Sequence, residues 1–239
     1  MPNVQTPERW PRSEMARKIL PKLFLYAMLF LLPRGIPAQS QQPFLLEDGQ
    51  AWAGLQVLVP LRQKIDLVLS GSTRLGQNVS HWVYERGGTA LLFRLGKHFT
   101  LSPMYNHIAT QPLPGRHGRE NRFSLDNTFN FSLRHFILSD RNLLERRLQS
   151  PVNSSRYRNA LQLSRPVKME KISLLLFVSD EFLYDWKVNT WSRNRFSVGV
   201  SKDLAEKISL DLYYLRQNGK SSNVPRDLHV IGTTLKIKL

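Results

Sequence analysis

The sequence has no cysteine among its 239 residues. Disulfide bonds and thiolate metal sites are therefore excluded. Acidic residues are also scarce, because 18 Asp and Glu stand against 34 Lys and Arg and leave a formal net charge of +16. An excess of this size is typical of proteins that bind nucleic acid or anionic membranes. Here the basic residues are spread through alternating segments and form neither a tail nor a helix face, so we expect no nucleic-acid partner.

Patterns of catalytic or cofactor-binding residues are missing as well. The six histidines are scattered, and the chain has no glycine-rich phosphate loop and no nucleophile elbow. We therefore predict no metal, no cofactor and no catalytic residue. A set of Ser, His and carboxylate on a barrel is recognised by geometry and not by sequence. An outer-membrane hydrolase or acyltransferase thus stays open as an alternative.

The longest apolar run, residues 23–32, is too short for a transmembrane helix, which needs about 20 apolar residues. Arg17 and Lys18 precede this run, and Ala38 follows it before a polar stretch. A basic start, a short apolar core and a small residue before the cleavage point are typical of a secretory signal peptide. We predict cleavage after Ala38, with an uncleaved anchor as the alternative.

This cleavage divides the chain into two parts. Residues 1–38 form the predicted signal peptide. Its polar residues 1–14 are consistent with a start codon that is assigned too far upstream. Residues 39–239 form one predicted domain, which has ample apolar material for a folded structure because hydrophobic residues make up 41% of the sequence.

Strict alternation of polar and apolar side chains runs through most of this domain. In the clearest case, Arg122 and Ser124 fall on one face while Phe123 and Leu125 fall on the other. Asn127 is an exception, because it is a polar residue on the apolar face. Successive side chains of a strand point to opposite faces, so the pattern predicts β-strands with one apolar and one polar face. We find no amphipathic helix, no βαβ unit and no repeat of fixed period.

Eleven such segments of about ten residues are joined by connections that alternate between short and long. Residues 111–120 are predicted to form the longest irregular connection, and residues 185–189 another of the long ones. This order predicts an all-β, up-and-down antiparallel barrel. Tight turns of outer-membrane barrels face the periplasm, and the first clear turn, which follows the segment at Trp52, is tight. The segment at Trp52 would therefore run towards the periplasm, so a strand that runs towards the outside must precede it. Phe44–Glu47 is the candidate for this strand. We therefore predict 12 strands, with 10 as the alternative.

The polar face of the segments carries Arg and Glu at short spacings. In a soluble barrel the apolar face forms the interior, whereas in a membrane barrel the apolar face contacts lipid and the charged side chains lie inside. The predicted signal peptide and the lack of cysteine favour the membrane barrel, in which a lipid-facing Arg would cost roughly 2–4 kcal/mol at the midplane. We expect a polar lumen with a cluster of ion-paired side chains. Its members are Arg141, Glu145, Arg147, Arg156, Arg158, Glu181, Arg193, Arg195 and Asp211.

Two further expectations concern particular side chains of this barrel. Glu145 and Glu181 should each contact arginines on neighbouring strands as ionised structural partners, because carboxylates surrounded by arginines stay charged. Aromatic residues near the segment ends should form girdles at the membrane interfaces, with core aromatics beside turns as the alternative. These aromatics are Trp52, Trp82, Tyr157, Tyr184, Trp186, Trp191 and Tyr214.

Several short motifs resemble those of a known bacterial family. They are Arg141-Asn142-Leu143-Leu144-Glu145-Arg146-Arg147, Arg156-Tyr157-Arg158, Glu181-Phe182, Asn194-Arg195 with Gly199, the early Asp48 and Trp52, and the closing Asp227-Leu228-His229-Val230-Ile231-Gly232. Over most of residues 48–239 the sequence resembles the family catalogued as domain of unknown function 2490. The resemblance implies an outer-membrane or periplasm-facing β-barrel of Gram-negative bacteria, and it implies no activity. Proteins of this type usually end in Phe, whereas this chain ends in Leu239.

The sequence therefore predicts an exported protein of the outer membrane, acting structurally or as a channel for small solutes. An arginine-rich lumen would favour anions. The expected partners are outer-membrane lipid and small anionic solutes, and we expect a monomer. The alternatives are a lipid-modifying enzyme of the outer membrane and a soluble periplasmic barrel that binds an anionic ligand.

Overall fold

The computed structural model describes residues 46–113, 115–169, 172–221 and 224–239. The predicted signal peptide and its cleavage site lie outside the described residues. Eleven strands make up the described chain. They are β1 (Leu46–Arg62), β2 (Ile65–Gly76), β3 (His81–Leu95), β4 (Phe99–Leu113), β5 (Arg116–Leu133), β6 (Phe136–Gln149), β7 (Ser154–Met169), β8 (Ile172–Asp185), β9 (Thr190–Ala205), β10 (Ile208–Ser221) and β11 (Val224–Lys238). Within these ranges, no helix is long and apolar enough to cross a membrane.

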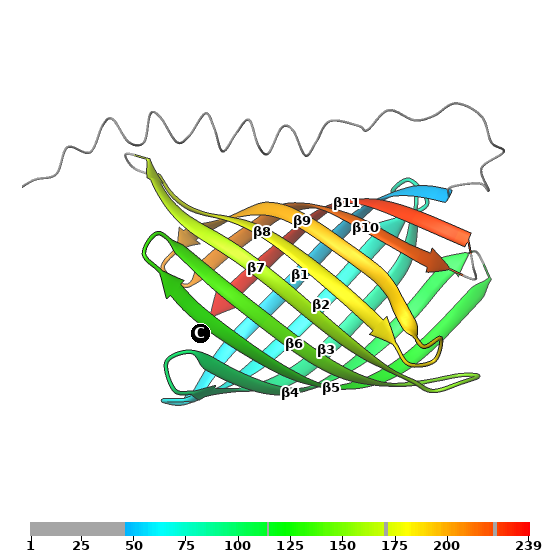
Figure 1. Ribbon diagram of the computed structural model, residues 1–239, viewed down its shortest axis with the longest axis horizontal. Helices are drawn as coiled ribbons and strands as arrows, with labels where there is room; N and C mark the ends of the chain where they lie inside the picture. The colour runs from blue at the N-terminus through cyan, green and yellow to red at the C-terminus, as the bar shows by residue number, and fades with distance from the viewer. Residues whose placement is uncertain (1–45, 114, 170–171, 222–223) are drawn as a thin grey trace, which may run out of the picture. The chain divides into compact units, whose positions relative to one another are not determined.

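The strands form one closed barrel and run diagonally across its wall (Figure 1). Consecutive strands pair in antiparallel fashion, as the order of short and long connections predicted. The barrel closes where β1 meets β11, and this pair is parallel. At this seam Gln50 lies opposite Val230, and Trp52 lies opposite Gly232.

The strand number corrects both counts expected from the sequence. The described barrel has eleven strands, not 12 or 10. The expected separate strand at Phe44–Glu47 lies partly outside the described residues, and its described part, Leu46 and Glu47, belongs to β1, which is 17 residues long. An odd number of strands can close because the ends of the sheet meet in a parallel pair, whereas the sequence argument assumed antiparallel pairs throughout.

The strands are also longer than the segments of about ten residues read from the sequence. They contain 12 to 18 residues. The stretch 111–120, expected as the longest irregular connection, is largely the hairpin of β4 and β5, in which Thr110 lies opposite Gly118. A register shift between Thr110 and Leu113 accommodates the irregular residues, so Pro112 and Gly118 do not end the ladder.

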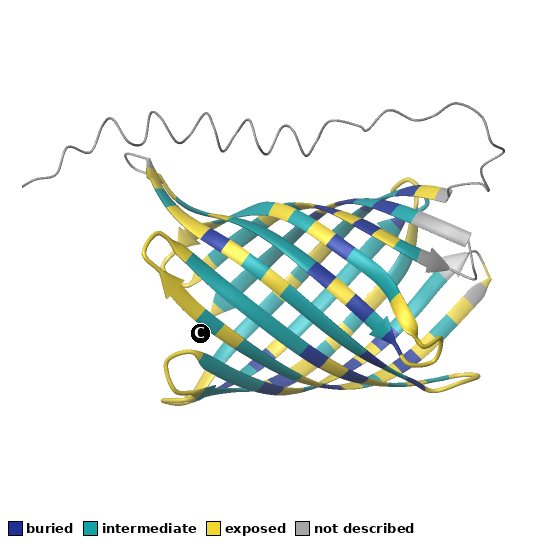
Figure 2. Ribbon diagram, viewed as in Figure 1, coloured by how far each residue is buried: buried dark blue, intermediate teal, exposed yellow. Residues whose placement is uncertain are grey.

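The apolar face of the wall points outward. Leu161 and Ile231 leave 49% and 58% of their surface exposed, whereas Glu145 leaves 4%. Figure 2 shows the exposed and buried residues following one another along single strands. A small buried cluster of Leu215, Leu228 and Val230 is packed against Trp52 and Tyr213 on the inner side of the seam.

Most of the aromatics expected in girdles lie near strand ends, and three of these, Trp82, Trp186 and Trp191, are exposed. Tyr184 lies at the centre of one group, with ring centroids 5.7 Å from Trp186 and 5.4 Å from Trp191. Tyr157 joins the group at 6.4 Å from Trp191. Trp82 is 56% exposed, and Tyr214 packs against His229 on the outer face.

Trp52 is the exception among these aromatics, and its expected place in a girdle is wrong. It lies on the inner face, where its indole N–H donates to Gln50. The two faces of β1 are both rich in small and apolar residues, so the alternation there did not distinguish inside from outside.

Candidate functional site: a charged barrel interior

The inner wall from β5 to β10 holds a continuous chain of side chains with alternating charge. The chain starts at Asp185, which lies 3.8 Å from a guanidinium nitrogen of Arg147. Arg147 lies 2.8 Å from Glu120, and Glu120 lies 2.6 Å from Arg122. Arg122 in turn lies 3.2 Å from Glu145, all measured between nitrogen and oxygen.

The same chain continues across the next strands. Glu145 lies 3.2 Å from Arg158, and Arg158 lies 2.6 Å from Glu181. Glu181 also lies 3.1 Å from Arg195, whose Nε donates to Gln217 at 2.8 Å. Each carboxylate in the middle of the chain therefore bridges two arginines on different strands, which links β5 to β10 through side chains as well as through the backbone ladder.

The strand register produces this arrangement. Glu145 lies directly opposite Ser124 on β5 and Arg156 on β7, and both neighbours face inward with it. Its two arginine partners are each one inward position away from these neighbours: Arg122 precedes Ser124 on β5, and Arg158 follows Arg156 on β7. Long side chains reach such diagonal neighbours easily.

A second feature of the interior is an arginine held between two aromatic rings. The guanidinium carbon of Arg74 lies 3.7 Å from the ring centre of Trp52 and 4.0 Å from that of Tyr84. Arginine stacks well on aromatic faces because its guanidinium is planar and weakly hydrated. Among the described residues no carboxylate pairs with Arg74, so its charge is not neutralised by an ion pair.

Two other inward arginines also have no carboxylate partner in the described chain. Arg86 on β3 has a buried Nε without a hydrogen-bond partner. Arg193 on β9 follows the same inward alternation as Arg195. The positive charge of the interior is therefore not fully balanced by the carboxylates.

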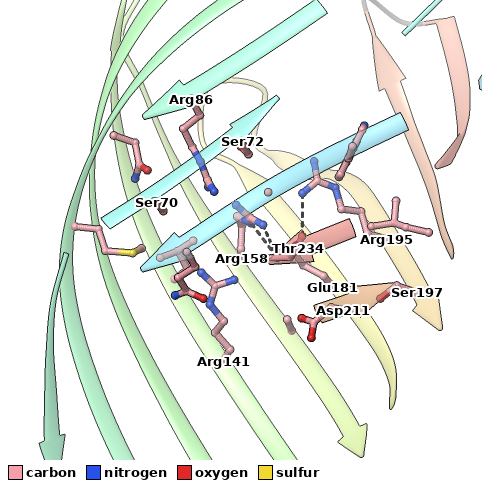
Figure 3. A pocket seen from close by; sticks show the side chains of 18 of the residues that line it. Ser70, Ser72, Arg86, Arg141, Arg158, Glu181, Arg195, Ser197, Asp211 and Thr234 are labelled. Carbon is pink, nitrogen blue, oxygen red and sulfur yellow. Dashed lines mark hydrogen bonds and ion pairs between the residues drawn. The ribbon is translucent and has the colours of Figure 1, made fainter. Parts of the chain in front are cut away.

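Arg74, Arg86 and the middle of the chain of alternating charges line a cavity of about 510 Å³ inside the barrel. Its walls carry six arginines but only three carboxylates, together with serine hydroxyls and the Trp52 and Tyr213 rings. Figure 3 shows Arg86, Arg141 and Arg158 reaching into this space from different strands, with Glu181 joined to Arg158 and Arg195. Such a set of guanidinium groups can donate several charge-assisted hydrogen bonds to one oxyanion.

The structure brings together most of the charge cluster expected from the sequence. Glu145, Arg147, Arg158, Glu181 and Arg195 belong to the chain of alternating charges. Three other members are paired beside it. Arg156 contacts Asp185 at 3.1 Å, Arg141 contacts Asp126 at 2.5 Å, and Asp211 contacts Lys236 at 2.6 Å. Arg193 is the member that joins no ion pair among the described residues.

The sequence reasoning missed several residues that complete the site. The sequence predicts an irregular connection at Glu120 and a loop at Asp185, although both side chains contact Arg147. Arg74 and Arg86 were not singled out, because an isolated arginine on a polar face gives no sign of its surroundings. The usable signal was alternation alone, since Arg74 shares its face with Ser70 and Ser72.

The described histidines lie outside the cavity that the arginines line. In the part of the chain that the structure describes, no group of three or more His, Asp or Glu could hold a metal ion. All six histidines are described, and none of them lines the cavity. His107 and His229, for example, bond to outward-facing Asn121 and Tyr214.

The fold and the interior define a closed β-barrel with a charged, arginine-rich inside and an apolar outside. A family model matches residues 49–227 of this chain, and its description is "Protein of unknown function (DUF2490)". The match covers well over half of the sequence, so the chain belongs to this family, as its motifs indicated. No curated protein matches the chain.

Proposed function

We propose that this protein is an outer-membrane β-barrel whose interior binds small anions and lets them pass. The observation that carries the proposal is the imbalance of charge in the cavity, where six arginines face three carboxylates. Rings of Arg or Lys select for anions in pores, because they lower the energy of an anion inside the barrel and repel cations.

The outward face supports placement in a membrane. Large apolar side chains such as Leu125, Leu144 and Leu161 are 40–49% exposed, and they lie on the outer face of the neighbouring strands β5, β6 and β7. Soluble monomers rarely expose continuous apolar surface of this extent. The aromatic group around Tyr184 and Trp191 stands where an interfacial girdle would be expected.

The unpaired arginines support the choice of anions as the ligand. An arginine inside the chain of alternating charges already has carboxylate partners, so it has few donors left for a solute. Arg74 and Arg86 have none, and both line the cavity. The stacking of Arg74 between two rings also holds its guanidinium in one place without neutralising it.

This proposal can be tested by conductance in planar bilayers with a KCl gradient. We expect the wild-type protein to give a reversal potential on the anion-selective side. The double variant Arg74→Gln/Arg86→Gln removes two positive charges from the cavity and leaves the chain of alternating charges intact. It should shift the reversal potential towards cation selectivity, because fixed charge in a narrow pore sets its preference.

The matched control is Arg134→Gln, which removes one positive charge at the exposed turn between β5 and β6. It should leave the reversal potential unchanged. A cation-selective or non-conducting wild-type protein would contradict the channel. Recovery of the folded protein in the soluble periplasm would favour the soluble barrel with an anionic ligand, because the same arginines would then bind a ligand in a closed interior.

A further inference from the structure

A row of asparagines crosses the apolar outer wall. Asn127 on β5 lies directly opposite Asn142 on β6, and Asn142 lies directly opposite Asn159 on β7. All three face outward, since they alternate with inward residues such as Asp126, Leu143 and Arg158. We call Asn127, Asn142 and Asn159, together with the adjacent Asp140, the asparagine row.

The asparagine row is flanked by exposed apolar side chains on both sides. On β5, Leu125 precedes Asn127 and Phe129 follows it on the same face, and they are 40% and 38% exposed. On β6, the half-buried Leu138 and the 46% exposed Leu144 enclose Asp140 and Asn142 on the same face. The row therefore lies within the apolar part of the wall on these two strands.

Hydrogen bonds inside the row leave some groups unsatisfied. The Asn159 amide nitrogen donates to Asp140 at 2.7 Å and to the Asn142 side-chain oxygen at 3.1 Å. The Tyr157 hydroxyl also donates to this Asn142 oxygen. Within the described residues, the Asn142 amide nitrogen and the whole Asn127 amide have no hydrogen-bond partner, and neither does the second oxygen of Asp140.

Lipid cannot satisfy these groups. Acyl chains offer no hydrogen bonds, so an unsatisfied polar group facing them costs free energy. Long side chains such as Arg146 on the same face can extend to the polar headgroups, but Asn and Asp are too short for this. Charged and polar side chains in a membrane are usually turned towards protein for this reason.

We propose that the asparagine row is a contact surface for a second copy of this chain, so that two barrels associate side by side. The inference rests on the membrane placement proposed above. The unsatisfied groups comprise donors on Asn127 and Asn142 and acceptors on Asp140 and Asn127, so the surface is complementary to itself. A two-fold axis brings the same patch of both copies together, which is the condition for such pairing. The monomer expected from the sequence took no account of this surface.

The test measures the mass of the purified protein in a neutral detergent, by light scattering after gel filtration, over a range of protein concentrations. We expect the wild type to have the mass of two chains. The variant Asn127→Leu/Asn142→Leu removes the free donors and should raise the dissociation constant of the dimer at least tenfold. Leucine suits the outer face, so the barrel itself should still form.

The matched control is Thr233→Leu, which makes a similar polar-to-apolar change on the outer face of β11, away from β5–β7. It should dimerise like the wild type. Each sample is also run unheated and boiled on a gel, because a folded barrel migrates differently before boiling.

A wild type with the mass of one chain throughout, or a leucine variant that dimerises like the wild type, overturns the proposed contact. In either case, a heat-shifted band shows that the proposed membrane barrel folds without this contact between copies. Absence of the shift in the wild type instead contradicts the proposed function itself, so the two failures are distinguishable.

Discussion

Glu145→Ala is expected to lower the free energy of unfolding of the barrel by about 3–5 kcal/mol, because it breaks a buried ion pair and leaves the partner charges unmatched. Glu145 bridges Arg122 and Arg158, each at 3.2 Å, and only 4% of its surface is exposed. Without the carboxylate, two guanidinium groups would face one another across β6. The measurement is the urea midpoint of the purified protein in lipid vesicles or detergent.

Glu85→Ala serves as the control for this change. Glu85 also lies within a strand, but it faces outward, is exposed and forms no ion pair among the described residues. Its removal should alter the unfolding free energy by no more than about 0.5 kcal/mol, as surface substitutions usually do. Equal midpoints for Glu145→Ala and the wild type would show that the chain of alternating charges does not stabilise the barrel.

Gly199→Val is expected to disturb the pairing of β9 with β8 and β10 in the barrel wall. A Cβ at Gly199 would lie 2.7 Å from the Leu212 carbonyl oxygen, 2.7 Å from the Tyr213 Cβ and 2.5 Å from the Phe177 ring. The carbonyl belongs to the backbone of β10, so it cannot rotate away as a flexible side chain would. We expect a loss of roughly 3 kcal/mol or more from overpacking, measured as a lost or reduced heat-shifted band.

The sequence offers a matched control for this glycine as well. A Cβ at Gly87 would meet nothing within 4 Å, because this residue faces open space on β3. Gly87→Val should therefore fold and give the same heat-shifted band as the wild type. A folded barrel for Gly199→Val with wild-type stability would show that β9 and β10 can separate more easily than the geometry indicates.

Alternation in the sequence was sufficient to predict the class of fold and the direction of most side chains. Arg122 and Ser124 face inward while Phe123 and Leu125 face outward, because one step along a strand always changes the face. Alternation also separated eleven segments, which is the number of strands in the described barrel. The expectation of a twelfth strand rested on antiparallel pairing throughout, and the parallel contact between β1 and β11 leaves no local pattern in the sequence.

The composition of the interior was predictable, but its contacts were not. The sequence placed Glu145 and Glu181 among arginines, and the structure shows which arginines they bridge. Those partners depend on the register of each hairpin. The prolines and glycines of residues 111–120 predict an irregular connection where β4 and β5 pair as a hairpin, so the sequence does not place Glu120 in the cluster. Arg74 was missed because its surroundings come from β1 and β3 as well as from its own strand.

The parallel seam between β1 and β11 has a consequence for the order in which the barrel assembles. Every other pair joins consecutive strands, whereas Gln50 and Val230 are 180 positions apart. Closing so long a stretch of chain costs more entropy than forming a hairpin, and contacts of long sequence separation slow folding. We therefore expect the seam to form last, when the Trp52, Tyr213 and Val230 side chains can pack together. Until then β1 and β11 are edge strands with unpaired backbone groups, and the incomplete sheet is at its most vulnerable to pairing with another chain.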